Sequence, residues 1–142
     1  MESGFNSNNE LVDYLVRTNR IESESVEEAF RNVDRRDFVP NKSRSRAYAD
    51  SPVPLDGVTV SAPHVVAMVT ELLDLTGSES VLEVGSGSGY QAAILGELSD
   101  SVVGVEIRED LAEQSRNRVP DNVEIRVGSG FEAVEEDFDR VL

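Results

Sequence analysis

The sequence predicts an α/β fold in which a doubly wound, mostly parallel sheet follows an N-terminal helical segment. A short apolar strand, Val81–Val84, leads into glycines at alternate positions within residues 85–89. An apolar helical stretch over residues 91–98 follows, and then a second apolar segment, Val102–Ile107. Strands that alternate with helical stretches favour a parallel sheet with helices on its faces.

The elements ahead of the first strand are helical. Residues 9–20 place apolar side chains on one helical face, which predicts a first helix. The order Ser-Val-Glu-Glu fits a capping box and predicts a second helix from Ser25 to about Val33. Residues 34–60 are punctuated by Pro and Gly and are expected to be irregular. Helix formers resume after Pro63, and a helix to Leu73 is expected to cover the start of the sheet.

The segments after Ile107 continue the predicted alternation of helices and strands. Residues 109–118 are expected to form a crossover helix, 123–127 a third strand and 138–142 a fourth. A length of 142 residues predicts one structural unit. Within it we separate an N-terminal segment, 1–60, which covers substrate and cofactor, from a nucleotide-binding half, 61–142. A ligand is expected beyond the carboxyl ends of the strands.

Composition excludes several classes of function. The net charge is −15, from 28 acidic and 13 basic residues, and such a surface repels nucleic-acid phosphates. We expect instead a salt-adapted, cytoplasmic protein, because screening by salt weakens self-repulsion. With no Cys and one His, a metal site is not expected. No apolar run is long enough to span a membrane, and no signal peptide is visible at the N-terminus.

The glycine spacing separates two classes of cofactor. A dinucleotide-binding loop needs a small residue where this chain has Tyr90. Gly-x-Gly-x-Gly preceded by an acid, here Glu83, is typical of S-adenosylmethionine-dependent methyltransferases. Glu106 closes the next apolar strand about 20 residues after Gly85, the distance at which an acid accepts hydrogen bonds from a ribose diol. The alternative for Glu106 is an ordinary solvated carboxylate.

Further motifs resemble one family, the protein-L-isoaspartate (D-aspartate) O-methyltransferases. The most specific is the segment from Val58 to His64, Val-Thr-Val-Ser-Ala-Pro-His, which general methyltransferases lack. The segment 36–40 resembles the family's Arg-x-x-Phe-Val-Pro, and 47–50 its Ala-Tyr-x-Asp. The glycine loop and residues 138–142 match the family's cofactor loop and fourth strand. The resemblance implies a Rossmann-like class I methyltransferase fold.

The resemblance implies a repair reaction on isoaspartyl-containing proteins or peptides. A methyl group passes from S-adenosyl-L-methionine to the carboxylate of an L-isoaspartyl or D-aspartyl residue, and the ester then cyclises and reopens as aspartate. A carboxylate is already ionised at neutral pH, so no strong general base is needed. Alignment of two bound reactants in a water-poor site is the main requirement.

The resemblance also implies the site residues. Ser61 occupies the position of the active-site serine, although a helix N-cap role is the alternative. His64 contacts the cofactor or the substrate, or else only packs or caps. Glu83 organises the loop amides and the amino end of the cofactor, or else is a solvated carboxylate of the strand. Cofactor contacts are expected from Val58, Thr59, Val60, Ser61, His64, Glu83, Gly85, Ser86, Gly87, Ser88, Gly89, Glu106, Ser129 and Gly130.

The chain departs from the family at two places. The family has Gly-Asp-Gly where this chain has Gly-Ser-Gly, so Ser129 lacks the charge that reads the adenine amino group. The resemblance also stops inside the fourth strand, about halfway through the family's sheet. Three interpretations stay open: a fragment of a longer enzyme, a chain completed by a partner or a homodimer, and a cofactor-binding module that is inactive alone.

Overall fold

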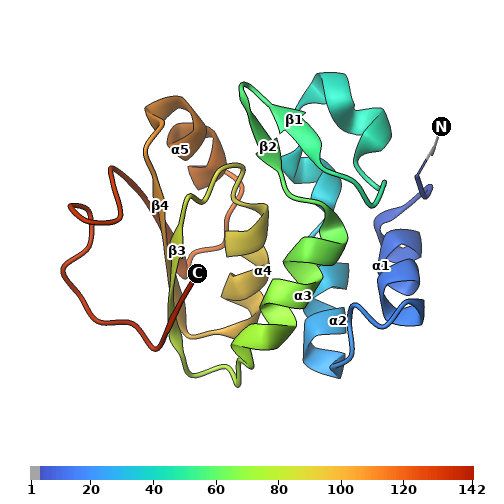
Figure 1. Ribbon diagram of the computed structural model, residues 1–142, viewed down its shortest axis with the longest axis horizontal. Helices are drawn as coiled ribbons and strands as arrows, with labels where there is room; N and C mark the ends of the chain where they lie inside the picture. Colours follow the sequence, from blue (N-terminus) through green and yellow to red (C-terminus); the bar gives the residue numbers. More distant parts are fainter. Residues whose placement is uncertain (1–3) are drawn as a thin grey trace. The chain divides into compact units, whose positions relative to one another are not determined.

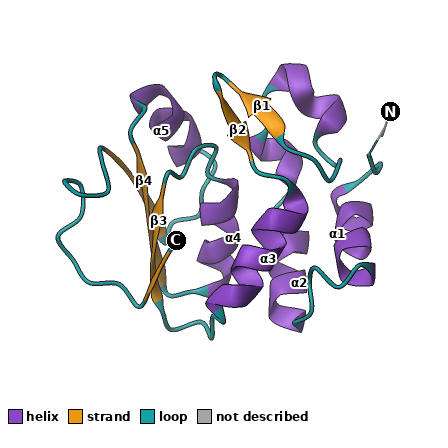
Figure 2. Ribbon diagram, in the orientation of Figure 1, coloured by secondary structure: helices purple, strands orange, loops and turns teal. Residues whose placement is uncertain are grey.

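The computed structural model describes residues 4–142 and separates into two compact units, the first ending at Asp74 and the second beginning at Leu75. This division differs from the one expected from the sequence, because the helix after Pro63 belongs to the first unit rather than to the half that carries the sheet. Figure 1 follows the chain through both units, and Figure 2 separates helices from strands.

The first unit is built on the helices α1 (Asn8–Arg17), α2 (Glu24–Asn32) and α3 (Pro63–Leu73), which pack against one another. Their apolar faces form its core, in which Leu11, Leu15 and Phe30 are fully buried. Ser7 and Ser23 cap the first two helices through their side chains. The helix start predicted at Ser25 is therefore wrong, because the Ser23 hydroxyl accepts the hydrogen bond from Val26 N.

The segment expected to be irregular is more ordered than its prolines suggest. Short 3-10 helices η1 (Arg35–Phe38) and η2 (Asn41–Arg46) precede an antiparallel hairpin of β1 (Val53–Leu55) and β2 (Val58–Val60). Asp56 and Gly57 join these strands, both with positive φ, as a type I′ turn requires. The hairpin delivers β2 directly to the start of α3.

The second unit confirms the predicted parallel α/β arrangement. Its strands are β3 (Ser80–Val84), β4 (Ser101–Glu106), β5 (Val123–Val127) and β6 (Arg140–Val141). They lie in the order β5-β4-β3-β6 and every pair is parallel. The chain moves outward from β3 to β5 and then returns to the other side of β3. The strand order therefore reverses beside β3, where doubly wound folds bind ligands.

The two faces of this sheet are covered differently. Helices α4 (Tyr90–Leu98) and α5 (Glu109–Arg116) pack on strands β4 and β5. On the other side from α4 lies the segment 128–139, which contains no helix (Figure 1). Side chains of this segment, Phe138 among them, pack on a core cluster formed by Leu82, Val103 and Val105.

Arg126 holds the segment 128–139 in place. Its guanidinium donates to the carbonyl of Ala133 at 3.1 Å and pairs with Glu136 at 2.7 Å and with Glu124. The Arg126 guanidinium lowers the pKa of Glu136 to about 2, because it hydrogen-bonds the ionised carboxylate. The connection from β5 to β6 is therefore a loop held by side-chain contacts.

Candidate functional site

The glycine loop between β3 and α4 is tied to the end of the neighbouring strand. The backbone N–H groups of Gly85 and Ser86 both donate to the carbonyl of Val105, at 2.8 and 3.1 Å. The N–H of Gly87 donates to the Glu106 carboxylate at 2.9 Å. The loop therefore has one defined shape, and α4 begins directly after it with its positive N-terminal end at the loop.

The conformation of this loop explains its glycines. Gly85, Gly87 and Gly89 all have positive φ, with values of 83°, 52° and 89°. A Cβ placed on Gly85 or Gly87 would meet no atom within 4 Å, so both face open space where a ligand can approach the backbone. On the adjacent strand, a Cβ on Gly104 would lie 2.9 Å from that of Ser86, so the absence of a side chain at 104 admits the loop.

Glu106 ends β4 with a carboxylate that is buried and already hydrogen-bonded. One oxygen accepts from Gly87 N and the other from Arg108 N, each at 2.9 Å. A carboxylate has about four acceptor positions, so ligand hydroxyl groups can still be bound. The alternative of a freely solvated Glu106 does not describe this side chain, which is 7% exposed.

In the part of the chain that the structure describes, Glu83 is the acid of the second unit that has a buried oxygen without a hydrogen-bond partner. Its side chain is buried, and its Oε1 has no hydrogen-bond partner within the described residues. Burial, together with the nearby negative charge of Glu106, raises the pKa of Glu83 to about 8. The Ser86 hydroxyl is likewise buried without a partner in the described structure. Two buried polar atoms at the base of the loop therefore lack a hydrogen-bond partner within the described residues.

Ser129 and Gly130 lie at the same edge of the sheet. Gly128 N donates to the carbonyl of Glu106 at 3.0 Å, which places the start of this segment beside the end of β4. A Cβ on Gly130 would lie 3.2 Å from a Val84 methyl group, so the segment also runs close to the end of β3. The second unit therefore brings together the predicted ligand residues Glu83, the loop, Glu106, Ser129 and Gly130.

The predicted residues of the first unit lie on β2 and at the start of α3. Val58 and Thr59 are exposed and Val60 is buried. Ser61 is exposed just ahead of α3, whose N-cap is Ala62. The alternative role of Ser61 as the helix N-cap is therefore wrong.

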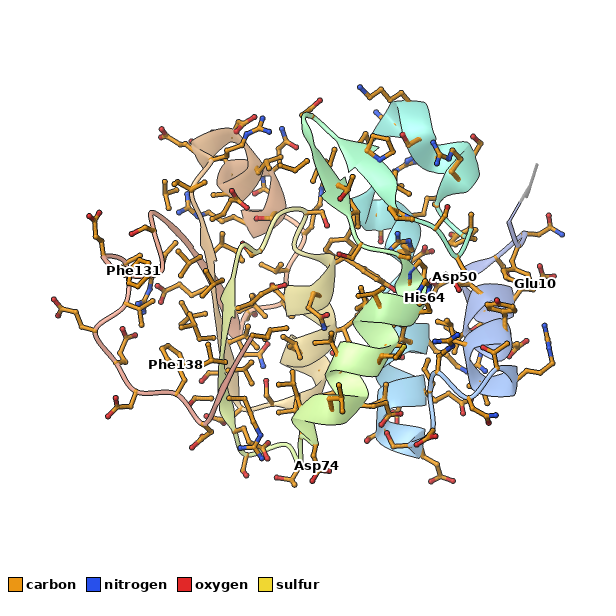
Figure 3. The ribbon with its side chains drawn as sticks, in the orientation of Figure 1. Glu10, Asp50, His64, Asp74, Phe131 and Phe138 are labelled. Atoms are coloured by element: carbon orange, nitrogen blue, oxygen red, sulfur yellow. The ribbon has the colours of Figure 1, made fainter. Side chains whose placement is uncertain are left out.

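Asp50, which precedes His64 by 14 positions, provides a side-chain cap at the start of α3. One carboxylate oxygen of Asp50 accepts from the backbone N–H of His64 and also contacts the His64 ring at Nδ1, both at 2.9 Å. Figure 3 shows the two side chains together at the start of the helix. A carboxylate is favoured at a helix N-terminus by the positive end of the helix dipole.

Arg35 is a residue of this region that the sequence motifs did not single out. Its side chain is fully buried, and Nη2 donates to the carbonyl of Ser61 at 3.0 Å. The sequence contains the signal, because Arg-x-x-Phe counted back from Phe38 begins at Arg35 and not at Arg36, where the predicted motif begins. Asp50 ends the Ala-Tyr-x-Asp motif, which by itself predicts no contact for this side chain.

The comparisons with known proteins agree with these motifs. The family model of the protein-L-isoaspartate (D-aspartate) O-methyltransferases matches residues 6–141. The chain belongs to this family. The resemblance predicted from the sequence is therefore confirmed, and it extends over both units.

Curated relatives in this family are 40% or more identical to the chain. A protein-L-isoaspartate O-methyltransferase 2 of Shewanella sediminis is 42% identical over 85% of this chain and 52% of its own length. A protein-L-isoaspartate O-methyltransferase of Methanopyrus kandleri is 43% identical over 93% of this chain and 63% of its own. The chain thus spans about half to just under two thirds of these relatives.

Solved structures give the same family and fold. A Plasmodium falciparum structure, described as a protein-L-isoaspartate O-methyltransferase in complex with S-adenosyl-L-homocysteine, has a TM-score of 0.80 at 26% identity. The match covers 96% of this chain and 72% of that one. Another protein-L-isoaspartate O-methyltransferase has a TM-score of 0.83 and is covered over 47% of its length. The Rossmann-like methyltransferase fold predicted from the sequence is confirmed.

Two further findings concern other kinds of site. Within residues 4–142, no group of three or more His, Asp or Glu side chains is placed to hold a metal ion. In the same part of the chain, no helix combines the length and the apolar character needed to cross a bilayer.

Proposed function

We propose that this chain carries the cofactor-binding part, and part of the substrate-binding region, of an S-adenosyl-L-methionine-dependent protein-L-isoaspartate O-methyltransferase. The observation that carries the proposal is the glycine loop, which is fixed by Val105 and Glu106 and open on the side of Gly85 and Gly87. Family membership supports the same assignment. The substrates are proposed to be L-isoaspartyl and D-aspartyl residues of damaged proteins.

The residues of the second unit fit the cofactor chemically. Glu106 is proposed to accept hydrogen bonds from the ribose, and the backbone around Gly85–Gly89 to approach the methionine portion. Glu83, with its unpartnered buried oxygen, is proposed to face the amino end of the cofactor. Ser86, Ser88, Ser129 and Gly130 complete the proposed contacts. When bound, the cofactor supplies an electrophilic sulfonium methyl group.

The residues of the first unit are proposed to hold the substrate. The Ser61 hydroxyl and nearby backbone amides would orient the isoaspartyl carboxylate, one of whose oxygens forms the new bond to the methyl carbon. The sulfur keeps the electron pair of the bond that breaks, and the carboxylate becomes a neutral ester. Val58, Thr59, Val60 and His64 are proposed to run beside the cofactor. Since the acceptor is already ionised, these residues need only position it and exclude water.

Calorimetry and methyl-transfer assays test the proposal. Titration of the chain in concentrated KCl with S-adenosyl-L-homocysteine should release heat with one binding site. Ser61→Ala should abolish methylation of an isoaspartyl peptide while leaving the dissociation constant of the cofactor nearly unchanged. A Ser61→Ala chain that loses cofactor binding and methylation equally would show that Ser61 is structural instead.

The surroundings in which the protein works are also proposed from its charge. With 28 acidic residues against 13 basic ones, of which a single one is Lys, we propose a cytoplasm rich in salt. High ionic strength reduces the Debye length to a few ångströms, and the repulsion among surface carboxylates then falls.

A further inference from the structure

Three segments distant in the sequence converge within the first unit. Asp34 accepts a hydrogen bond from the Tyr48 hydroxyl at 2.8 Å, which joins the start of η1 to the segment that carries Asp50. Arg35 Nη2 donates to the carbonyl of Ser61 at 3.0 Å and to that of Ser51 at 3.5 Å. One buried guanidinium therefore links the residue after Asp50 to Ser61.

The second link is made by Asp50 itself. Its Oδ1 receives the backbone N–H of His64 and lies 2.9 Å from His64 Nδ1. The Asp50 side chain is 15% exposed and that of His64 is 36% exposed, so the carboxylate lies inside and part of the ring reaches the surface. The segment Ser61–His64 is thus fixed at both ends, by Arg35 and by Asp50.

The contact between Asp50 and the ring decides the tautomer of His64. An ionised carboxylate only accepts hydrogen bonds, so Nδ1 must carry the proton. In the neutral imidazole, Nε2 is then left as an acceptor. A ring held in this way offers a lone pair, rather than an N–H group, to whatever binds at the start of α3.

We propose that Asp50 is a positioning residue for the methyl donor, acting through His64. It fixes the ring so that Nε2 accepts a hydrogen bond from a donor group of the cofactor, such as its ammonium group or a ribose hydroxyl. This inference rests on the proposed function. Arg35, at the other end of the segment, keeps the backbone of Ser61 in the same fixed frame.

A double-mutant cycle separates the ring from the backbone contact. Asp50→Asn can keep an oxygen on His64 N, but the same oxygen contacts Nδ1, and without the charge it holds the Nδ1–H less strongly. Calorimetry with S-adenosyl-L-homocysteine should show at least tenfold weaker binding for Asp50→Asn and for His64→Gln. The double variant should bind within twofold of His64→Gln alone.

An equal loss from Asp50→Asn in both backgrounds would overturn the inference, because only the backbone cap would then explain it. Asp37→Asn is the matched control, since it removes the same charge from an exposed position of the first unit. Its dissociation constant should equal that of the unchanged chain. Thermal unfolding of each variant identifies any loss of folded protein.

The tautomer is measured without any ligand. His64 is the single histidine of the chain, so a long-range ¹H–¹⁵N spectrum contains one imidazole. At about pH 8.5, where imidazoles are ordinarily neutral, the unchanged chain should show a protonated Nδ1, and Asp50→Asn should show a larger share of the form protonated at Nε2. A protonated Nε2 in the unchanged chain would overturn the positioning role alone. A protonated Nδ1 with no heat of cofactor binding would overturn the proposed function as well.

Discussion

At the scale of single residues, Glu83 carries the largest electrostatic cost in the second unit. It is buried at the base of the glycine loop, beside Glu106, with one oxygen that lacks a partner within the described residues. Its pKa rises from the ordinary 4.5 to about 8 because burial and the neighbouring carboxylate both disfavour the charged form. A group whose pKa differs between the folded and the unfolded chain makes protein stability depend on pH.

The sign of the effect follows from proton counts. Between about pH 4.5 and 8 the folded chain holds the Glu83 proton and the unfolded chain does not. The contribution of Glu83 to the free energy of unfolding should therefore be greatest below pH 4.5 and fall as pH rises toward 8, by up to about 1.4 kcal/mol per pH unit. Glu83→Gln should remove this component. Urea denaturation of both chains from pH 5 to 9 measures it, and identical slopes would contradict the assignment.

Ser129 offers a prediction about the cofactor itself. The family pattern has Asp at this position, and an acid accepts a stronger hydrogen bond from an adenine amino group than a serine does. Ser129→Asp should lower the dissociation constant of S-adenosyl-L-homocysteine roughly fivefold, since hydrogen bonds to charged groups contribute about 1 kcal/mol more than neutral ones. Gln114→Glu, which adds the same charge on the exposed face of α5, is the control. An unchanged constant would mean that the adenine is held by other groups.

At the scale of elements, the glycine loop depends on a strand that has no side chain where the loop crosses it. A Cβ on Gly104 would lie 2.8 Å from Ile125 Cδ1 and 2.9 Å from Ser86 Cβ. Ile125 can avoid the contact by a rotation of its flexible side chain. The Cβ of Ser86 is bonded directly to the loop backbone, so it can move only if the loop moves. Gly104→Ala should therefore move the loop as well as strain the core.

Gly104→Ala is expected to cost about 1–3 kcal/mol of stability, measured by urea unfolding, as overpacked cores do. It should also weaken cofactor binding at least tenfold in calorimetry. Gly96→Ala provides the matched control, because its Cβ would lie 2.8 Å from Val123 Cγ2, away from the loop. That variant should lose stability but keep its affinity. Equal affinities for both variants would show that the loop tolerates displacement.

The elements of the second unit could be predicted because their signals are local. The strand expected over residues 123–127 has those bounds, and the glycine loop joins a strand to a helix as expected. The hairpin of the first unit was missed although Asp56-Gly57 is a strong two-residue turn signal. Prolines in the flanking segments favoured an irregular assignment, and strands of three residues have too little alternation to oppose it.

The interactions around Ser61 could not be predicted in the same way. Arg35 and Asp50 reach Ser61 and His64 across 26 and 14 positions of the sequence. No periodicity connects residues at such separations, and only folding brings them together. Family motifs marked each segment, but they do not show that the segments form one hydrogen-bonded network.

At the scale of the whole molecule, repulsion among negative charges is the main electrostatic effect on the stability of the folded chain. A net charge of −15 on 142 residues makes every surface carboxylate repel many others, which destabilises the compact state at low ionic strength. The described ion pairs are few relative to this excess and lie mostly at the surface, as those of Arg31 with Asp13 and Glu27 do. Such exposed pairs contribute at most about 1 kcal/mol each, so they do not offset the repulsion.

Raising KCl from millimolar to molar concentration should therefore raise the thermal unfolding midpoint, because screening reduces repulsion more than it weakens the exposed pairs. The midpoint is followed by circular dichroism at fixed pH. Replacing the exposed acids Glu113, Asp121 and Glu132 by their amides should make the chain more stable in low salt and flatten its response to KCl. A midpoint that falls with KCl in the unchanged chain would refute salt adaptation.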